Sequence, residues 1–219
     1  MSGNESDDEP QLSATTLAAL QEFYVEEEER NNKLKNILNS ASDDIPRFQE
    51  NWQLSQFWYD EETTNKLSEE ILRATVENGK IALISCPTLY KRIKSTSTGH
   101  TGRFNKQKMC LFEFDERFAA YGNDFCFYDY QCPLQIPKTF AGNFDVVVAD
   151  PPFLSEECLT KTAITIKFLA KEKVLLCTGE LMDDLAHRLL QVSKTPFQPK
   201  HSNNLGNEFR CYANYSTSF

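Results

Sequence analysis

The feature that most constrains the fold is an apolar run at residues 144–149 that stops abruptly at Asp150-Pro151-Pro152-Phe153. A continuous apolar run of this length predicts a strand that is covered on both faces, as in a parallel sheet. Similar runs lie at 81–86, 109–114, 125–128 and 174–178, with helical stretches at 156–170 and 180–192. This alternation predicts an α/β fold with a doubly wound, mostly parallel sheet.

The end of the chain has a different character. The turn residues Asn204-Leu205-Gly206-Asn207 lie between an extended stretch beginning at Phe197 and an apolar run at 209–215. This pattern predicts an antiparallel hairpin that closes the sheet.

The negative charge is concentrated near the amino terminus. The formal net charge is −9, and residues 1–44 hold 11 of the 32 acids but only 3 of the 23 bases. We therefore predict an acidic, disordered leader at 1–10, a helical extension at 11–45 and the main α/β domain at 46–219. Because the main domain is nearly neutral, the overall charge does not exclude nucleic acid as a partner.

Cysteine and histidine usage indicates an intracellular protein without a metal site. The seven cysteines form no Cys-x-x-Cys pair, and the three histidines are far apart in the sequence. Such a pattern is typical of reduced, buried thiols. With no apolar stretch long enough to span a membrane and a polar amino terminus, we expect a cytoplasmic protein.

The segment from Asp150 to Phe153 is the candidate catalytic site. The Asp150 carboxylate can accept a hydrogen bond from a substrate nitrogen, and the rigid backbone of Pro151 and Pro152 can present a carbonyl as a second acceptor. Phe153 offers a flat face for a base or an alkyl chain. The alternative is an ordinary strand end followed by a proline turn.

Acids that follow two other strands are candidates for binding a nucleoside cofactor. A carboxylate can accept hydrogen bonds from both ribose hydroxyls, and Asp115 has the required position. Glu113 competes for this role, but strand alternation predicts that it points back into the sheet. Asp129 could accept a hydrogen bond from an adenine amino group, or it could simply belong to a turn.

The loop after the first strand contains no glycine, which excludes the common dinucleotide-binding fingerprint. It reads Ser85-Cys86-Pro87-Thr88. We expect the Ser85 and Thr88 hydroxyls, or the backbone around Pro87, to hold the polar end of a cofactor.

Two further segments each allow two interpretations, and a third segment predicts the start of a helix. The aromatic residues Phe57, Trp58 and Tyr59 could be a packed entry segment or a lid over a ligand. Between Asn78 and Phe112 lie seven bases and no acid. This window, with its flexible, non-helical stretch 95–102, could be a solvated connector or a substrate-docking loop. Ser68 is expected to cap a helix that runs to about residue 78.

Taken together, these motifs resemble the class I S-adenosylmethionine-dependent methyltransferases. The segments that carry the resemblance are 53–59 (QLSQFWY), 85–90 (SCPTLY), 112–118 (FEFDERF) and 150–153 (DPPF). More narrowly, they resemble the elongation factor 1-alpha lysine methyltransferases, formerly described as N6-adenine-specific DNA methyltransferases.

The resemblance implies a seven-stranded sheet, S-adenosyl-L-methionine as cofactor, and methylation of a lysine of translation elongation factor 1-alpha. Separately, we expect the protein to be a monomer. The resemblance also implies that Asp150 and the Pro151 carbonyl position the target nitrogen and that Asp115 binds the ribose. Residues 57–59 and the 150–153 segment would then frame the substrate entrance.

Two other functions stay open. Methylation of adenine in DNA or RNA requires base flipping, which is normally supported by many phosphate contacts. Only the basic window could supply such contacts, and no recognition domain is visible. The remaining alternative is a non-catalytic binding module that retains the methyltransferase fold.

Overall fold

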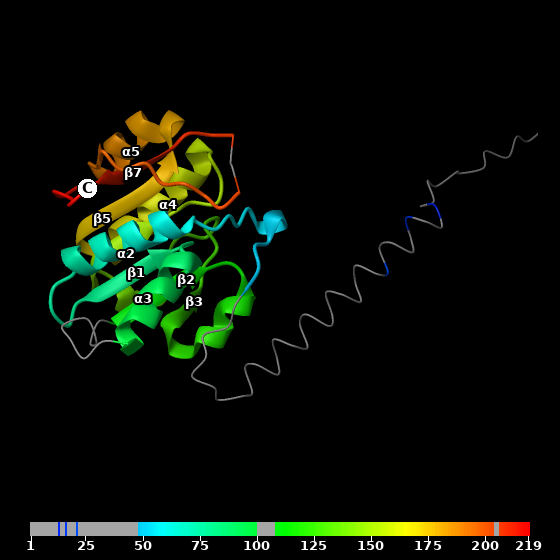
Figure 1. Cartoon of the computed structure of the whole chain (residues 1–219), viewed down its shortest axis with the longest axis horizontal. Coiled ribbons are helices and arrows are strands. Elements are labelled where there is room, and N and C mark those ends of the chain that lie inside the picture. The colour runs from blue at the N-terminus through cyan, green and yellow to red at the C-terminus, as the bar shows by residue number, and fades with distance from the viewer. Residues whose placement is uncertain (1–12, 14–15, 17–20, 22–47, 100–107, 204–205) are drawn as a thin grey trace, which may run out of the picture. The chain divides into compact units, whose positions relative to one another are not determined.

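The computed structural model describes residues 13, 16, 21, 48–99, 108–203 and 206–219. The predicted leader at 1–10 and nearly all of the predicted extension at 11–45 lie outside these residues. Within the described part of the chain, seven strands form one sheet with the order β3-β2-β1-β4-β5-β7-β6 (Figure 1). The strands are β1 (Lys80–Ile84), β2 (Lys108–Glu113), β3 (Phe125–Phe127), β4 (Phe144–Ala149), β5 (Ala170–Gly179), β6 (Ser193–Lys194) and β7 (Phe209–Ala213).

The directions of the strands confirm the predicted sheet. Strands β3, β2, β1, β4 and β5 are parallel to one another. Strand β7 runs antiparallel to both β5 and β6 and so closes the sheet with a hairpin. The first strand of that hairpin begins at Ser193, earlier in the chain than the sequence pattern indicated.

Helices cover both faces of the sheet. Helices α2 (Glu61–Ala74) and α3 (Pro87–Gly99) pack on one face, and α4 (Glu156–Leu169) and α5 (Asp183–Leu190) pack on the other. Short 3-10 helices are η1 (Trp52–Leu54), η2 (Glu116–Asp124), η3 (Lys138–Phe140) and η4 (Glu180–Met182).

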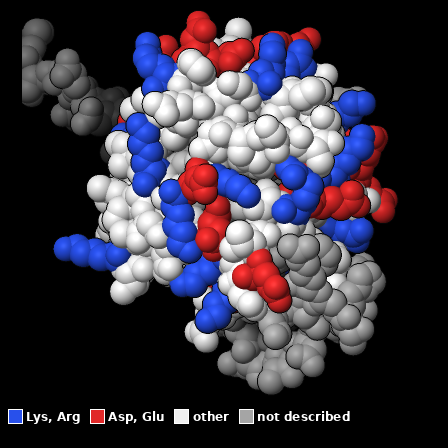
Figure 2. Space-filling model, turned by 90° about the vertical axis from the view of Figure 1, so that its left-hand side faces the viewer, with Lys and Arg blue, Asp and Glu red and all other residues white. Residues whose placement is uncertain are grey.

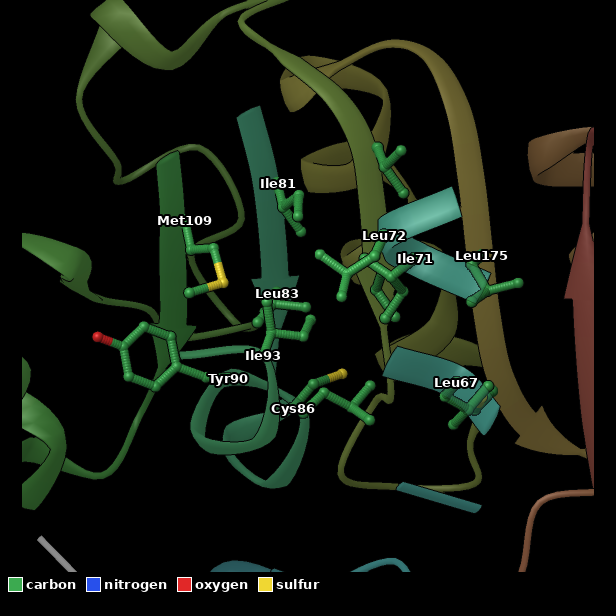
Figure 3. Packing of buried hydrophobic residues seen from close by; sticks show 14 of the residues in the cluster. Leu67, Ile71, Leu72, Ile81, Leu83, Cys86, Tyr90, Ile93, Met109 and Leu175 are labelled. Atoms are coloured by element: carbon green, nitrogen blue, oxygen red, sulfur yellow. The ribbon is translucent and has the colours of Figure 1, made fainter. Parts of the chain in front are cut away.

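Side-chain alternation in the central strands divides the core into two layers. In β1, Leu83 packs toward α2 and α3, whereas Ile84 packs toward α4 and α5. Figure 3 shows the first layer, in which Ile93 of α3 lies beside β1 and Ile71 of α2 lies over β4. Because β1 and β4 are covered on both faces, their continuous apolar sequences are explained.

The strand order creates a crevice at one edge of the sheet. From β1 the chain crosses to β2 on one side, and β4 lies on the other side of β1. Ligands of doubly wound sheets bind beyond the carboxyl ends of the strands at such a point, because the connecting loops diverge there. Asp150 follows β4 at this edge.

The predicted start of α2 was wrong by eight residues. The helix begins at Glu61, and its N-cap is Asp60, whose Oδ1 accepts a hydrogen bond from the Thr63 amide at 2.7 Å. Asp caps a helix as well as Ser does, and acids in the first turn interact favourably with the helix dipole. Ser68 is buried within the helix.

Residues 95–99 were predicted to be non-helical, and this was also wrong, because they form the last turns of α3. The Ser95 and Thr96 hydroxyls both donate to the Arg92 carbonyl oxygen, at 2.8 and 2.9 Å. Such bonds let serine and threonine remain inside a helix that their intrinsic preference disfavours. The rest of the window, 100–107, lies outside the described residues.

No helix in the described ranges is both long and apolar enough to cross a bilayer. The seven cysteines are free thiols, and five of them are buried.

Candidate functional site

A cavity of about 570 Å³ lies at the carboxyl ends of the parallel strands. Ligand sites commonly have volumes of about 300–1,000 Å³. Its lining comes from five parts of the chain, at 53–59, 85–88, 113–114 with 128–131, 150–154, and 201 with 206, 207 and 209. Every predicted site residue except Asp115 contributes to this lining, so the fold brings distant motifs together.

Asp150 lies in the cavity and is hydrogen-bonded by a tyrosine. The Tyr59 hydroxyl donates to Asp150 Oδ2 at 2.6 Å. Burial raises the pKa of the Asp150 carboxyl to about 7; the Tyr59 hydrogen bond lowers it, and the charge of Glu113 raises it further. Asp150 retains some accessible surface because it lines the cavity, yet the surrounding protein still desolvates its charge. The site therefore holds a carboxylate that exchanges its proton near neutral pH.

This raised pKa predicts a pH-dependent effect of Asp150→Asn on stability. A carboxyl whose pKa is higher in the folded than in the unfolded protein loses stabilisation as the pH rises toward the folded value. Asn cannot ionise, so the ligand-free variant should gain on the order of 3 kcal/mol relative to the wild type between pH 5 and pH 8. Urea unfolding of both proteins at the two pH values measures this difference. An equal difference at both pH values would contradict the raised pKa.

Glu113, and not Asp115, lines the cavity. The expectation that Glu113 points back into the sheet was wrong. Ile84, the last residue of β1, pairs with Phe112, so β1 does not extend beside Glu113. The Glu113 side chain can therefore turn into the crevice, where its Oε1 accepts a hydrogen bond from the Phe114 amide at 3.0 Å. Burial raises its pKa to about 7.

Asp115 serves a structural network beside the cavity. Its Oδ2 lies 2.6 Å from Arg117 Nη2 and accepts a hydrogen bond from Gln56 Nε2 at 3.0 Å. It also caps η2 by accepting from the Arg117 amide. The carboxylate is 5% exposed and already engaged by these donors. We therefore propose that Glu113 binds the ribose, in place of the predicted Asp115.

The loop after β1 achieves a tight turn without glycine. Ser85 adopts a left-handed conformation with φ 55, which glycine usually supplies at lower conformational cost. Pro87 then begins α3, where a missing N–H leaves no helical bond unmade. Ser85, Cys86, Pro87 and Thr88 all line the cavity at the start of this helix, and the Cys86 thiol also donates to the Ile84 carbonyl oxygen. Such strained backbone positions are often found at ligand sites.

The aromatic segment before α2 is packed against the C-terminal part of the chain. The Ser202 amide donates to the Trp58 carbonyl oxygen at 2.8 Å, and the Asp60 amide donates to the Lys200 carbonyl oxygen at 3.0 Å. Phe57 and Trp58 line the cavity, and their role at a substrate entrance stays a prediction. Tyr59 is only 5% exposed and reaches Asp150, so it lies deeper than an entrance residue. These contacts favour the packed entry segment over a mobile lid.

Exposed aromatic rings border the cavity. Phe153 is 43% exposed and its ring centroid lies 5.7 Å from that of Tyr130, while Phe114 is 48% exposed. Asp129 also lines the cavity, and its Oδ1 accepts a hydrogen bond from the Gln131 amide.

Some lining residues were not found from the sequence. His201, Asn207 and Phe209 lie about fifty residues after the Asp150 segment and follow no recognisable motif. The bridge between Tyr59 and His201 and the antiparallel return of β7 bring this part of the chain to the cavity.

At least one base in the described part of the basic window is paired with an acid. Lys94 is paired with Asp124 at 2.7 Å. On the face shown in Figure 2, lysines and arginines are interspersed with aspartates and glutamates. That face lies at the amino ends of the parallel strands, away from the cavity, so its charges do not decide what the cavity binds.

Comparisons with known proteins identify close relatives. A family model described as "Probable N6-adenine methyltransferase" matches residues 50–217. "EEF1A lysine methyltransferase 1" of Mus musculus is 48% identical, over 99% of this chain and 97% of that protein. A "Protein-lysine N-methyltransferase" of Caenorhabditis elegans is 46% identical over 98% of both chains. One of Saccharomyces cerevisiae is 38% identical over 94% of this chain and 92% of that protein.

Solved structures with little sequence similarity share the fold. A branched-chain polyamine synthase of Thermus thermophilus, in complex with N4-aminopropylspermidine and 5'-methylthioadenosine, matches with a TM-score of 0.52 at 11% identity, covering 78% of this chain and 60% of that chain. A protein of Pyrococcus horikoshii described as an RNA methyltransferase matches with a TM-score of 0.50 at 12% identity, covering 83% of this chain and 97% of that chain.

Proposed function

The chain belongs to the family of the EEF1A lysine methyltransferases, and we propose that it transfers a methyl group from S-adenosylmethionine to a lysine of translation elongation factor 1-alpha. The observation that carries this proposal is the placement of Asp150 in the cavity, at the crevice formed by the strand order. A carboxylate oriented by Tyr59 there can accept a hydrogen bond from an amine. The identity of the protein substrate follows from the names of the relatives.

The cavity suits S-adenosylmethionine in size and in chemistry. Glu113 can accept hydrogen bonds from two ribose hydroxyls, and the exposed ring of Phe114 offers a flat face to adenine. Asp129 stands where it could accept from the adenine amino group. Ser85 and Thr88 at the start of α3 offer hydroxyls to the polar end of the cofactor, and the positive end of the helix dipole favours its carboxylate.

In the proposed reaction, the bound cofactor supplies an electrophilic methyl group on a sulfonium. The residues of the chain align the lysine nitrogen with that methyl group, and such alignment is worth several kcal/mol. The nitrogen lone pair forms the new bond to carbon while the carbon–sulfur bond breaks and its electrons stay on sulfur. Asp150 and the Pro151 carbonyl are proposed to hold the nitrogen, with Pro152 and Phe153 shaping the rim.

The lysine must lose a proton before it can attack. With a reference pKa of about 10.4, deprotonation near pH 7 requires roughly 4–5 kcal/mol. Desolvation among Phe57, Trp58 and Phe153, together with the positive charge of the sulfonium, lowers the lysine pKa. We propose that the proton leaves to water.

The description of the family model points to a second candidate, methylation of adenine in DNA or RNA. The same acceptors could hold an adenine amino group. The lysine-specific names of the relatives favour a protein substrate. We further propose that the protein acts as a cytoplasmic monomer, which light scattering and cell fractionation would test.

The substrate classes can be separated directly. The full-length protein is incubated with radiolabelled S-adenosylmethionine and, in parallel, with purified elongation factor 1-alpha, duplex DNA or RNA. We expect label in the elongation factor alone, and we expect Asp150→Ala to abolish it. Mass spectrometry of the labelled protein then identifies the modified lysine and the number of methyl groups.

Two results would overturn the proposal. Labelling of nucleic acid but not of protein would support the adenine methyltransferase. Stabilisation by the cofactor without transfer to any substrate would support the non-catalytic module.

A further inference from the structure

The bond between Tyr59 and Asp150 connects residues that are 91 positions apart in the sequence. Its length of 2.6 Å is that of a hydroxyl donating to a charged oxygen. The phenol binds Asp150 Oδ2, and among the described residues no side chain donates to Oδ1. One oxygen is therefore held by the protein, while the other can accept a hydrogen bond from a ligand in the cavity.

Tyr59 is itself fixed by the C-terminal part of the chain. Its backbone forms an antiparallel bridge with His201, and its ring lies against the His201 ring at a centroid distance of 5.0 Å. The Ser202 hydroxyl donates to the Tyr59 carbonyl oxygen at 3.2 Å. Because both the backbone and the ring are held, the phenol is positioned before any ligand binds, as an efficient catalytic site requires.

We propose that Tyr59 is a positioning residue for methyl transfer, whose hydroxyl holds the Asp150 carboxylate in the orientation that accepts the substrate amine. This inference rests on the proposed function, because it assumes that Asp150 binds the amine. It replaces the predicted role of Tyr59 at the substrate entrance. Burial, together with the charge of Asp150, raises the pKa of Tyr59 well above its ordinary value, so the phenol remains a donor at neutral pH.

The effect of Tyr59 on Asp150 can be separated from that of its other neighbours. The titratable groups that face Asp150 are Tyr59 before α2, Cys86 at the start of α3, Glu113 at the end of β2 and Cys177 on β5, and His201 lines the same cavity. Among these, the Tyr59 hydrogen bond stabilises the ionised carboxylate, whereas the charge of Glu113 opposes ionisation. Removing the Tyr59 hydroxyl should therefore raise the pKa of Asp150 above about 7.

Tyr59→Phe tests this role because it removes only the hydroxyl. At pH 7 we expect kcat to fall about tenfold, the typical effect of losing a hydrogen bond to a charged group. The KM for elongation factor 1-alpha and the dissociation constant of S-adenosylmethionine should change by less than about threefold, since the ring stays in place. The acidic limb of the kcat–pH profile should move to higher pH. The lysine of the substrate titrates equally with both enzymes and cannot cause that shift.

Tyr90→Phe is a matched control. It also removes a tyrosine hydroxyl that donates to a carboxylate, that of Asp124 at 2.9 Å, but this pair does not line the cavity. We expect it to lower the thermal stability while leaving the kcat–pH profile unchanged. If Tyr59 had only a structural role, Tyr59→Phe would likewise lower the thermal stability and leave the kcat–pH profile unchanged.

A second measurement needs no substrate. Carboxyl-carbon NMR titration reads the pKa of Asp150 directly, with Asp150→Asn identifying the resonance. We expect a higher pKa in Tyr59→Phe than in the wild type. An active wild type together with an unshifted pH profile or an unshifted titration in Tyr59→Phe would overturn the role of Tyr59 alone. A wild type that methylates no lysine would instead overturn the proposed function and this role with it.

Discussion

Asp150→Asn is expected to lower kcat for lysine methylation by about 100-fold or more, because misorientation of a reacting group commonly has an effect of this size. Asparagine keeps the shape of the side chain and can still accept a hydrogen bond from Tyr59. It lacks the negative charge, and its amide nitrogen donates where the substrate amine requires an acceptor. The nitrogen is then no longer held in line with the methyl group. Single-turnover methylation of elongation factor 1-alpha measures the loss of rate.

Binding of S-adenosylmethionine should be largely preserved in Asp150→Asn. The proposed contacts of the nucleoside are made by Glu113, Phe114 and Asp129, which the substitution does not touch. Isothermal titration calorimetry should therefore give a dissociation constant within about threefold of the wild type, less than 1 kcal/mol of binding free energy. Near-normal turnover would refute the assignment of Asp150.

Asp145→Asn is a control on the same strand. Asp145 lies on β4, accepts hydrogen bonds from the Lys80 amide and the Lys171 ammonium, and does not line the cavity. Its loss should lower stability without a specific effect on kcat. If both substitutions reduced kcat equally, the effect of Asp150→Asn would have to be attributed to the stability of the strand.

The sequence predicted the parts of the molecule whose signals are local. The apolar run of β4 and the proline segment after it are contiguous, so the position of Asp150 at the end of a central strand could be deduced. The approach of Tyr59 to Asp150 could not, because it depends on the bridge between Tyr59 and His201 across most of the chain. The start of α2 was missed because Asp60 and Ser68 are both good caps, and packing decides between them.

The roles of Glu113 and Asp115 illustrate the same limit. The prediction for Glu113, the last residue of β2, assumed that β1 continues beside it. The strand register shows instead that β1 ends at Ile84, opposite Phe112 and one residue before Glu113. A difference of one residue at a strand end decides which acid enters the cavity. Asp115 could be recognised as structural only when Arg117 and Gln56 were seen around it.

We therefore expect Glu113→Gln to weaken cofactor binding without lowering stability, and Asp115→Asn to lower stability without weakening cofactor binding. Losing charge-assisted hydrogen bonds to the ribose should weaken S-adenosylmethionine binding by about 10- to 100-fold, or about 1.5–3 kcal/mol. Glutamine also removes a carboxyl whose pKa burial raises to about 7, so Glu113→Gln should not destabilise the ligand-free protein at pH 8. Calorimetric titration and urea unfolding, both at pH 8, measure the two quantities.

Asp115→Asn should instead lower stability, because it leaves the Arg117 guanidinium without its charged partner in a largely buried site. Removing one member of such a pair typically costs about 3–5 kcal/mol, and the 13% exposure of the Arg117 side chain places the expected loss at the lower end. Cofactor affinity at a temperature well below unfolding should stay within about threefold of the wild type. If Asp115→Asn weakened the binding of S-adenosylmethionine and Glu113→Gln did not, Asp115 would be the residue that binds the ribose. The side chains would then have to exchange places when the cofactor binds, breaking the contacts of Asp115 with Arg117 and Gln56.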